Sequence, residues 1–369
     1  MAALLAVVVG LILYVTLSPF EFHLGARHGS VFVHLLHSWP SVTRRAFLRD
    51  SILNFALFLP LGVASCLTMA QYWKRRSAVL TAVAHGFALS LCIEVLQYYD
   101  VSRTSSIADI LFNTLGALAG ALGALVFQHR IEAFTSSADR RGASAGGLLA
   151  VCWIGAQLYP FLPVVTVSQI GHSWLRFAAT GLSWVEVVAG AAGWFVFGLA
   201  LRAIWGRLPW IWLAGCMLVV PIRLTIWERS VGPGDLAAAA LGLLLWCITG
   251  DSIRVGSGWV LMVTAVVLRE LAPFRFNAPA HPFSWYPFQA TLMASSNDAV
   301  PILLRKAFEY GSLVWLMHAG KYRHMLAGAL LATGLFGMEM MQTRMAGRSP
   351  EITDSVLVLL MALILRLVG

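Results

Sequence analysis

The chain has 369 residues, of which 59% are hydrophobic and 12% charged, and its formal net charge is +9. Soluble domains contain roughly 25% charged residues, so this composition excludes an ordinary soluble protein and predicts a polytopic membrane protein. Unsatisfied backbone groups are costly in lipid, so the apolar stretches are expected to cross as helices of about 20 residues. The excess of basic residues lies in short loops between the apolar stretches, and membrane topology accounts for basic residues there. The positive net charge therefore does not indicate a nucleic acid partner.

Apolar stretches follow one another along the whole chain, and we expect twelve membrane spans. The first has no basic start and no small-residue cleavage site, so it is predicted to be a retained helix and not a signal peptide. All five cysteines fall inside apolar stretches without a CxxC pair or zinc-ligand spacing, so no metal or other cofactor is expected. The expected spans are 2–17, 50–70, 78–99, 107–127, 147–167, 183–204, 208–227, 235–250, 257–272, 299–318, 324–343 and 352–368.

An arginine followed six residues later by an aspartate occurs three times, as RTSSIAD (103–109), RSVGPGD (229–235) and RSPEITD (348–354). The aspartates lie 126 residues (235 minus 109) and 119 residues (354 minus 235) apart, about four spans each time. This spacing predicts an all-α membrane protein of about twelve transmembrane helices, arranged as three parallel four-helix repeats. The predicted units are 1–127, 147–250 and 257–369, with a polar connector at 128–146.

The first and third predicted units share a Glu-x-x-Gln pair before the motif. The pairs are Glu94 with Gln97 and Glu339 with Gln342, and the glutamate precedes the motif aspartate by 15 residues both times (109 minus 94; 354 minus 339). In the middle unit a valine and an arginine stand at these positions. The middle unit is therefore predicted to be a degenerate copy.

Polar side chains around the first and third motifs are predicted to form ligand-binding clusters, because polar residues within apolar segments are costly and commonly mark sites. In the first unit an arginine could fold back to bridge the aspartate and the glutamate. The alternative is that each Arg-Asp pair pins a tight helix hairpin, with the acid at a helix N-terminus. The candidates from this pattern are Asn54, Glu94, Gln97, Arg103, Asp109, Asn113, Glu309, Glu339, Gln342, Arg348 and Asp354.

Two further patterns concern packing and topology. Gly116-x3-Gly120, followed by Gly123, is predicted to be a small-residue face for close helix contact. The basic runs at 74–76 and 139–141 are typical of cytoplasmic loops. We therefore expect both termini in the cytoplasm and the three motifs outside the inner membrane.

The runs RDSILNFALFLPLG (49–62), CIEVLQ (92–97) and RTSSIADILFNTLGALAG (103–120) together resemble the VanZ-like family, named for a membrane protein linked to teicoplanin resistance. The resemblance covers about 1–127 well and 257–369 in part, through RKAFEYGSLVW and EMMQ. It implies a helical membrane unit that acts at the cell envelope and contributes to antibiotic resistance. By motif match it also adds Asp50 to the candidate site residues.

Three functions stay open at this point. The leading hypothesis is binding or transport of an amphiphile, such as a lipid-linked glycan or a glycopeptide, by a protein whose other partners are membrane lipids. The second is an intramembrane enzyme with Glu94 or Glu339 as general base, although the sequence offers no obvious nucleophile. The third is a structural scaffold in which the polar clusters only hold helix hairpins together.

Overall fold

The structure is a computed structural model, and it forms two compact units, Met1–Ser136 and Ser137–Gly369. All structural statements below concern the residues that it describes, in which helices dominate and the β pairing consists of two isolated bridges, Phe22 with Asp100 and Ser284 with Glu351. The described residues are 2–17, 22–23, 29–39, 44–100, 104–134, 137–161, 171, 177, 180–206, 208–226, 231–276, 279–293 and 296–368.

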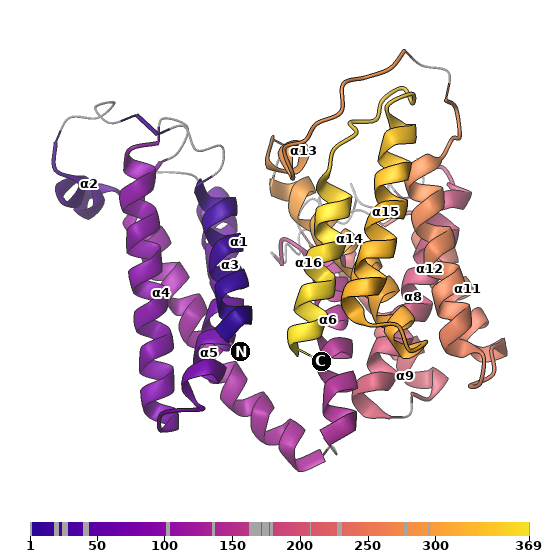
Figure 1. Cartoon of the computed structure of the whole chain (residues 1–369), viewed down its shortest axis with the longest axis horizontal. Helices are drawn as coiled ribbons and strands as arrows, with labels where there is room; N and C mark the ends of the chain where they lie inside the picture. The colour runs from indigo at the N-terminus through magenta and orange to yellow at the C-terminus, as the bar shows by residue number, and fades with distance from the viewer. Residues whose placement is uncertain are drawn as a thin grey trace. The chain divides into compact units, whose positions relative to one another are not determined.

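The N-terminal unit is a bundle of four long helices with one short helix beside them (Figure 1). Helix α3 packs against α1, α4 and α5, and α4 also packs against α1 and α5. Apolar side chains from α1, α3 and α4 meet in a buried cluster that includes Ile12, Phe58 and Ile93. The helices are α1 (Ala2–Leu17), α2 (Val31–His37), α3 (Arg44–Met69), α4 (Arg75–Tyr98) and α5 (Ile107–Phe134).

Glycines allow α3 and α5 to approach each other closely. A Cβ atom added at Gly116 would lie 2.2 Å from the carbonyl oxygen of Phe55, and one at Gly120 would lie 2.2 Å from that of Leu59. These distances confirm the predicted packing role of the two glycines, because no side chain fits there. Gly123 has no neighbouring atom within 4 Å of such a Cβ, so it is not part of the contact.

The C-terminal unit contains the remaining helices. Helix α8 packs against α6, α11 and α12, whereas α14 packs against α6, α12 and α16, and α15 packs against α16. The helices are α6 (Ser137–Leu158), α8 (Trp184–Trp205), α9 (Trp210–Cys216), α10 (Val219–Ile222), η1 (Arg223–Thr225), α11 (Pro233–Ile248), α12 (Arg254–Leu271), α13 (Gln289–Met293), α14 (Ser296–Ala319), α15 (His324–Gln342) and α16 (Thr353–Val368).

The seventh predicted span, 208–227, is not one continuous helix. It divides into α9, α10 and the 3₁₀ turn η1, with a break at residues 217 and 218. Pro221 favours the break, because a proline has no N–H and its ring clashes with the carbonyl group four residues earlier, here that of Met217. A proline does not suffice, however, since α3 continues through Pro60. The predicted connector at 128–146 contains the end of α5 and the start of α6, and the two compact units divide within it.

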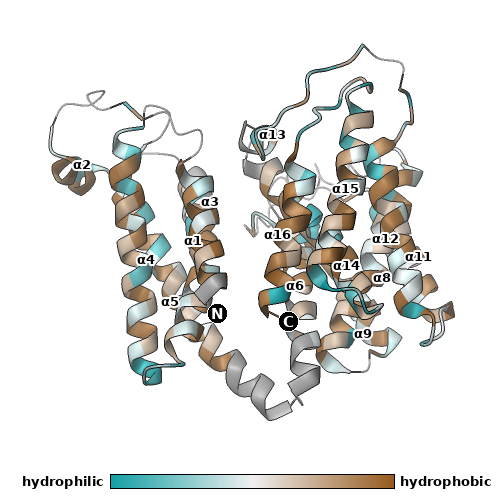
Figure 2. Ribbon diagram, viewed as in Figure 1, coloured by the Kyte–Doolittle hydropathy of each residue, from teal (hydrophilic) through white to brown (hydrophobic). Residues whose placement is uncertain are grey.

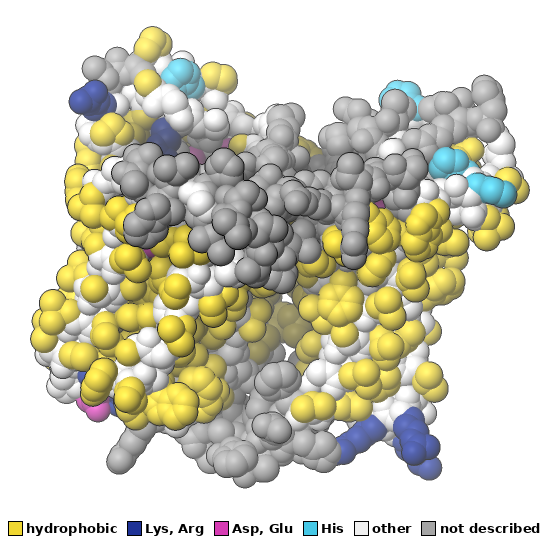
Figure 3. Space-filling model, turned by 180° about the vertical axis from the view of Figure 1, so that it is seen from behind, with side chains coloured by type: hydrophobic (Ala, Val, Ile, Leu, Met, Phe, Trp, Pro, Cys, Tyr) yellow, Lys and Arg dark blue, Asp and Glu magenta, His cyan; other side chains and the backbone are white. Residues whose placement is uncertain are grey.

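Several helices are long and apolar enough to cross a membrane. Apolar side chains cover the flanks of the helices, while lysine and arginine gather near helix ends (Figures 2 and 3). Shorter apolar helices cover 4–17, 142–158, 210–225 and 233–248. The protein is therefore an all-helical, multi-pass membrane protein. In the described part of the chain, the five helices that are both long and apolar enough are Asp50–Met69, Arg75–Tyr98, Ile107–Val126, Trp184–Trp205 and His324–Gln342.

Candidate functional site

A buried polar cluster lies where α4 meets the start of α5 in the N-terminal unit. The Glu94 carboxylate, only 2% exposed, accepts the backbone N–H of Ser106 at 2.7 Å. Asp109, in the first turn of α5, lies beside Asn54 of α3. Asp50, one turn before Asn54 on α3, also lies near Asp109. The structure thus brings these predicted residues together, whereas Arg103 lies outside the described residues.

One helical turn further along, the cluster continues between α4 and α5. The Asn113 amide donates to the Ser90 hydroxyl at 2.9 Å, and both side chains are buried. Gln97, near the end of α4, donates to the backbone oxygen of Thr16 at 2.9 Å and so ties α4 to the end of α1. Buried polar groups are costly without partners, so these bonds also stabilise the helix contacts.

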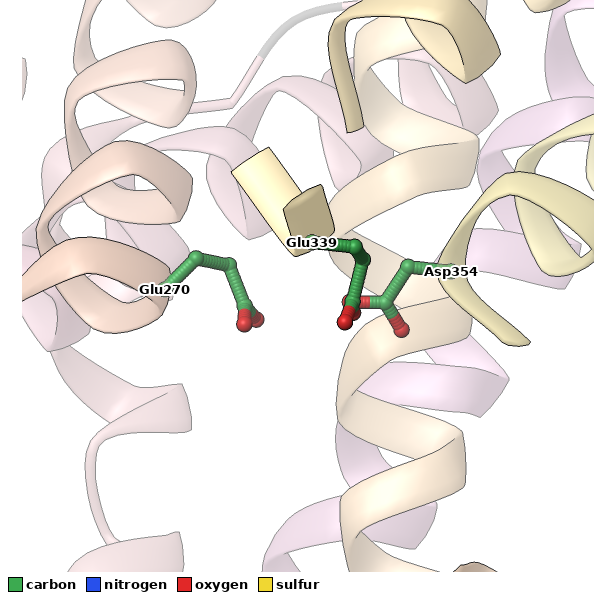
Figure 4. A group of neighbouring side chains, drawn as sticks. All are labelled: Glu270, Glu339 and Asp354. Atoms are coloured by element: carbon green, nitrogen blue, oxygen red, sulfur yellow. The ribbon is translucent and has the colours of Figure 1, made fainter. Parts of the chain in front are cut away.

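A second cluster lies between α12, α14, α15 and α16 in the C-terminal unit. The carboxylates of Glu270, Glu339 and Asp354 point toward one another, with one oxygen of each within 4.8 Å of the others (Figure 4). The Lys306 ammonium group donates to both Asp354 oxygens at 2.7 and 2.8 Å, and it lies 3.6 Å from Glu270. Lys306 therefore supplies the positive charge that a metal ion would bring to three carboxylates.

The two clusters share a hydrogen-bond pattern. The Glu339 carboxylate accepts the backbone N–H of Glu351 at 3.0 Å, and Glu351 lies twelve residues further along the chain. The Glu94 carboxylate likewise accepts the backbone N–H of Ser106, which also lies twelve residues further along. Gln342 donates to the backbone oxygen of Glu270 near the end of α12 at 3.2 Å. Gln97 donates to the backbone oxygen of Thr16 near the end of α1 in the same way. Both bonded oxygens belong to the residue three positions before a Pro-Phe pair.

Arg348 does not form, in the second cluster, the kind of bridge that was predicted for the arginine of the first unit. Its guanidinium group donates to the backbone oxygens of Arg269 at 2.6 Å and Ala272 at 3.0 Å. The last carbonyls of a helix have no partner within the helix, so Arg348 satisfies the C-terminal end of α12 and does not pair with the carboxylates. Lys306, which the sequence analysis missed, neutralises Asp354 instead.

Glu309 does not complete the second cluster as predicted. Its carboxylate pairs with Arg269 of α12 and lies 3.5 Å from Arg305, one turn earlier on α14. Glu309 follows Arg305 by four residues and Lys306 by three, and both spacings bring side chains near one face of a helix. The ion pair with Arg269 of α12 therefore decides which cavity the Glu309 carboxylate lines.

In the middle part of the chain, Asp235 pairs with Arg223 at 2.7 Å. Asp235 also accepts the backbone N–H of Gly232 at 2.8 Å and so caps the start of α11. Arg229, the expected partner from the motif, lies outside the described residues. Arg223 stands at the position of the missing glutamine, and its pairing with Asp235 could not be inferred from the repeated motif.

Among the cavities lined by described residues, two lie within the C-terminal unit. The smaller, of about 260 Å³, adjoins the second cluster and is lined by Glu270, Lys306, Glu339, Gln342, Arg348 and Glu351 among others. The larger, of about 310 Å³, is lined by Arg223, Asp235, Arg269, Arg305 and Glu309 together with residues of α6 and α8. The site is thus a set of buried polar clusters and cavities in a helical membrane protein.

A comparison with known protein families identifies the family that the N-terminal unit resembles. Residues 2–128, about a third of the chain, match the VanZ/LLP1 family. The N-terminal unit is therefore a VanZ-like unit, which confirms the resemblance found in its sequence. No curated protein and no solved structure matches the chain.

Proposed function

We propose that this protein binds the polar head group of an amphiphile, a lipid-linked glycan or a glycopeptide, and moves it within or across the inner membrane. The observation that carries the proposal is the cavity of about 260 Å³ beside a buried cluster of Glu270, Lys306, Glu339 and Asp354. Ionisable groups inside an apolar protein are costly, and a ligand site gives a reason for keeping four of them together.

The chemistry of this cavity suits a ligand with several hydroxyl or amino groups. Carboxylates accept hydrogen bonds only, and an amide both donates and accepts, so Glu339, Glu351 and Gln342 offer partners to a sugar or an amine. Because three carboxylates in the cluster face a single ammonium group, a head group that carries an amine is favoured over an anionic one.

We also propose that the chain consists of three related four-helix units, with twelve spans in total, termini in the cytoplasm and motifs outside. The packing pairs support this arrangement, because α12, α14, α15 and α16 contact one another as α1, α3, α4 and α5 do. The matching hydrogen bonds of Glu94 and Glu339 support it further. A contribution to glycopeptide resistance would follow from binding such a ligand at the cell envelope.

Binding of labelled teicoplanin and of a short-chain prenyl-linked glycan to the purified full-length protein tests the proposal. Glu339→Gln keeps an acceptor for the Glu351 N–H but removes one negative charge, so we expect affinity for at least one probe to fall about tenfold, about 1.4 kcal/mol. Asp251→Asn is the matched control, because Asp251 is exposed and lies outside both cavities. Unchanged affinity in a folded Glu339→Gln variant, or no saturable binding of either probe, would contradict the proposal.

A structural scaffold is the second candidate, and Arg348 is the observation that favours it. Both hydrogen bonds of its guanidinium group go to backbone oxygens at the end of α12, which is a structural role. Under this alternative the substitutions at Glu339 would lower thermal stability without changing the binding of any probe.

A further inference from the structure

The buried cluster beside the smaller cavity carries more negative charge than its basic groups balance. Its three carboxylates have one oxygen each within 4.8 Å of one another (Figure 4), and the residues that carry them are at most 7% exposed. The described lining of the cavity adds one acid, Glu351, and two bases, Lys306 and Arg348. Four acids therefore face two bases, because the neighbouring charged side chains on α12 and α14 line the larger cavity instead, namely Arg269, Arg305 and Glu309.

Asp354 takes most of the charge of the ammonium group in the cluster. Lys306 donates to both Asp354 oxygens at 2.7 and 2.8 Å, whereas it lies 3.6 Å from the Glu270 carboxylate. Asp354 also stands in the first turn of α16, where the helix dipole favours a negative charge. Asp354 is therefore the carboxylate best suited to stay ionised, and Glu270 and Glu339 are left with the smaller share of the positive charge.

Neutral hydrogen-bond donors hold Glu270 and Glu339 in place. The Glu270 carboxylate accepts from the Gln342 amide at 2.8 Å, and the Glu339 carboxylate accepts from the Glu351 N–H at 3.0 Å. Two buried carboxylates that are this close do not both ionise readily, because burial disfavours the charged form and like charges repel each other. A proton on one of the two carboxyl groups would relieve both effects.

A buried tyrosine hydroxyl beside the carboxylates is a second, independent observation. Tyr310 follows Lys306 by one turn of α14, its side chain is fully buried, and its hydroxyl lies beside Asp354. This hydroxyl has no hydrogen-bond partner among the described residues. Buried polar groups are costly without a partner, and a phenol both donates and accepts. Tyr310 can therefore bond a group that enters the cluster.

We propose that the cluster is a proton-binding site, in which Glu270 or Glu339 holds a proton at neutral pH and releases it to water when an ammonium group binds. The ligand arrives as an ammonium ion and the carboxylic acid becomes a carboxylate, so the net charge inside the site is unchanged. The inference rests on the proposed function for its ligand and adds the ion that is exchanged. Exchange at one shared site would let a proton gradient drive the movement of the ligand.

Infrared spectroscopy of the ligand-free, full-length protein tests for the proton, because the carbonyl stretch of a carboxylic acid differs from that of a carboxylate. At neutral pH we expect the carboxylic acid band to weaken in Glu339→Gln and to strengthen in Lys306→Met, which removes a positive charge. Asp251→Asn is the matched control and should leave the band unchanged, because Asp251 is exposed and lies outside both cavities. Thermal melting of each variant verifies that it is folded. An unchanged band in folded Glu339→Gln would overturn the proposal.

Isothermal titration calorimetry with octylamine tests the exchange, because an alkyl amine stays charged at neutral pH as a lysine side chain does. Titrations in two buffers of different ionisation enthalpy measure the protons released, and we expect about one per bound octylamine. The affinity for octylamine should rise with pH, because fewer sites then hold the competing proton. Binding without proton release, or no saturable binding, would overturn the exchange.

The infrared result separates this inference from the proposed function, because it requires no ligand. If teicoplanin and the prenyl-linked glycan do not bind but Glu339→Gln weakens the carboxylic acid band and octylamine releases a proton, the proposed function fails and the proton site stands. If either probe binds and the band is unchanged in Glu339→Gln, the proposed function stands and the proton site is overturned.

Discussion

Replacing Lys306 with methionine should remove the positive charge from the centre of the second cluster. The ammonium group lies 2.7 and 2.8 Å from the Asp354 oxygens, and the Asp354 side chain is only 1% exposed. Breaking a buried ion pair by removing one partner costs about 3–5 kcal/mol. Because the Lys306 side chain is 21% exposed and water reaches it in part, we expect the lower end, about 3 kcal/mol.

Titration of the purified protein with a denaturing detergent would measure this loss as a change in the free energy of unfolding. The double variant Lys306→Met with Asp354→Asn should be more stable than Lys306→Met alone, because it also removes a stranded carboxylate beside Glu270 and Glu339. Lys74→Met, at an exposed position, should change stability by less than about 0.5 kcal/mol. If the double variant lost as much unfolding free energy as Lys306→Met and Asp354→Asn lose together, or more, the reasoning would be refuted.

Two other substitutions test how the helices are held. Gly120→Ala should destabilise the N-terminal unit by about 1–3 kcal/mol, because the added Cβ would lie 2.2 Å from the Leu59 oxygen, whereas Gly123→Ala should be neutral or slightly stabilising in the same unfolding titration. Arg348→Gln should cost about 1–3 kcal/mol through the lost bonds to the end of α12 and leave probe binding near wild type; a tenfold loss of binding without a loss of stability would show that Arg348 contacts ligand.

Features that depend on neighbouring residues in the chain could be predicted from the sequence, and those that depend on distant partners could not. The length of the apolar stretches predicted the helices, and the spacing of Gly116 and Gly120 predicted a close helix contact but not its partner, α3. The break in the seventh span was harder to predict, because α3 continues through Pro60 and a proline alone therefore does not decide where a helix ends. Lys306 meets Asp354 across 48 residues, however, and no local pattern selects it over the nearer Arg348.

Glu309 illustrates a further reason why sequence alone places a side chain poorly. Consecutive residues on a helix point about 100° apart, so neighbours such as Arg305 and Lys306 face different sides of α14. Arg305 and Glu309 line the larger cavity, and Lys306 lines the smaller. The sequence analysis assigned Glu309 to the cluster of the third unit, but its actual neighbours depend on which helices pack against each face of α14.

Helices α12 and α14 form a wall that the two cavities share. On α12, Arg269 lines the larger cavity and the next residue, Glu270, lines the smaller, and Arg305 and Lys306 divide in the same way on α14. Since each helix carries charged groups for both cavities, a ligand that shifts either helix in one cavity would also move the charges of the other. Such coupling is reciprocal for binding, so a ligand in either cavity should change the affinity for a ligand in the other.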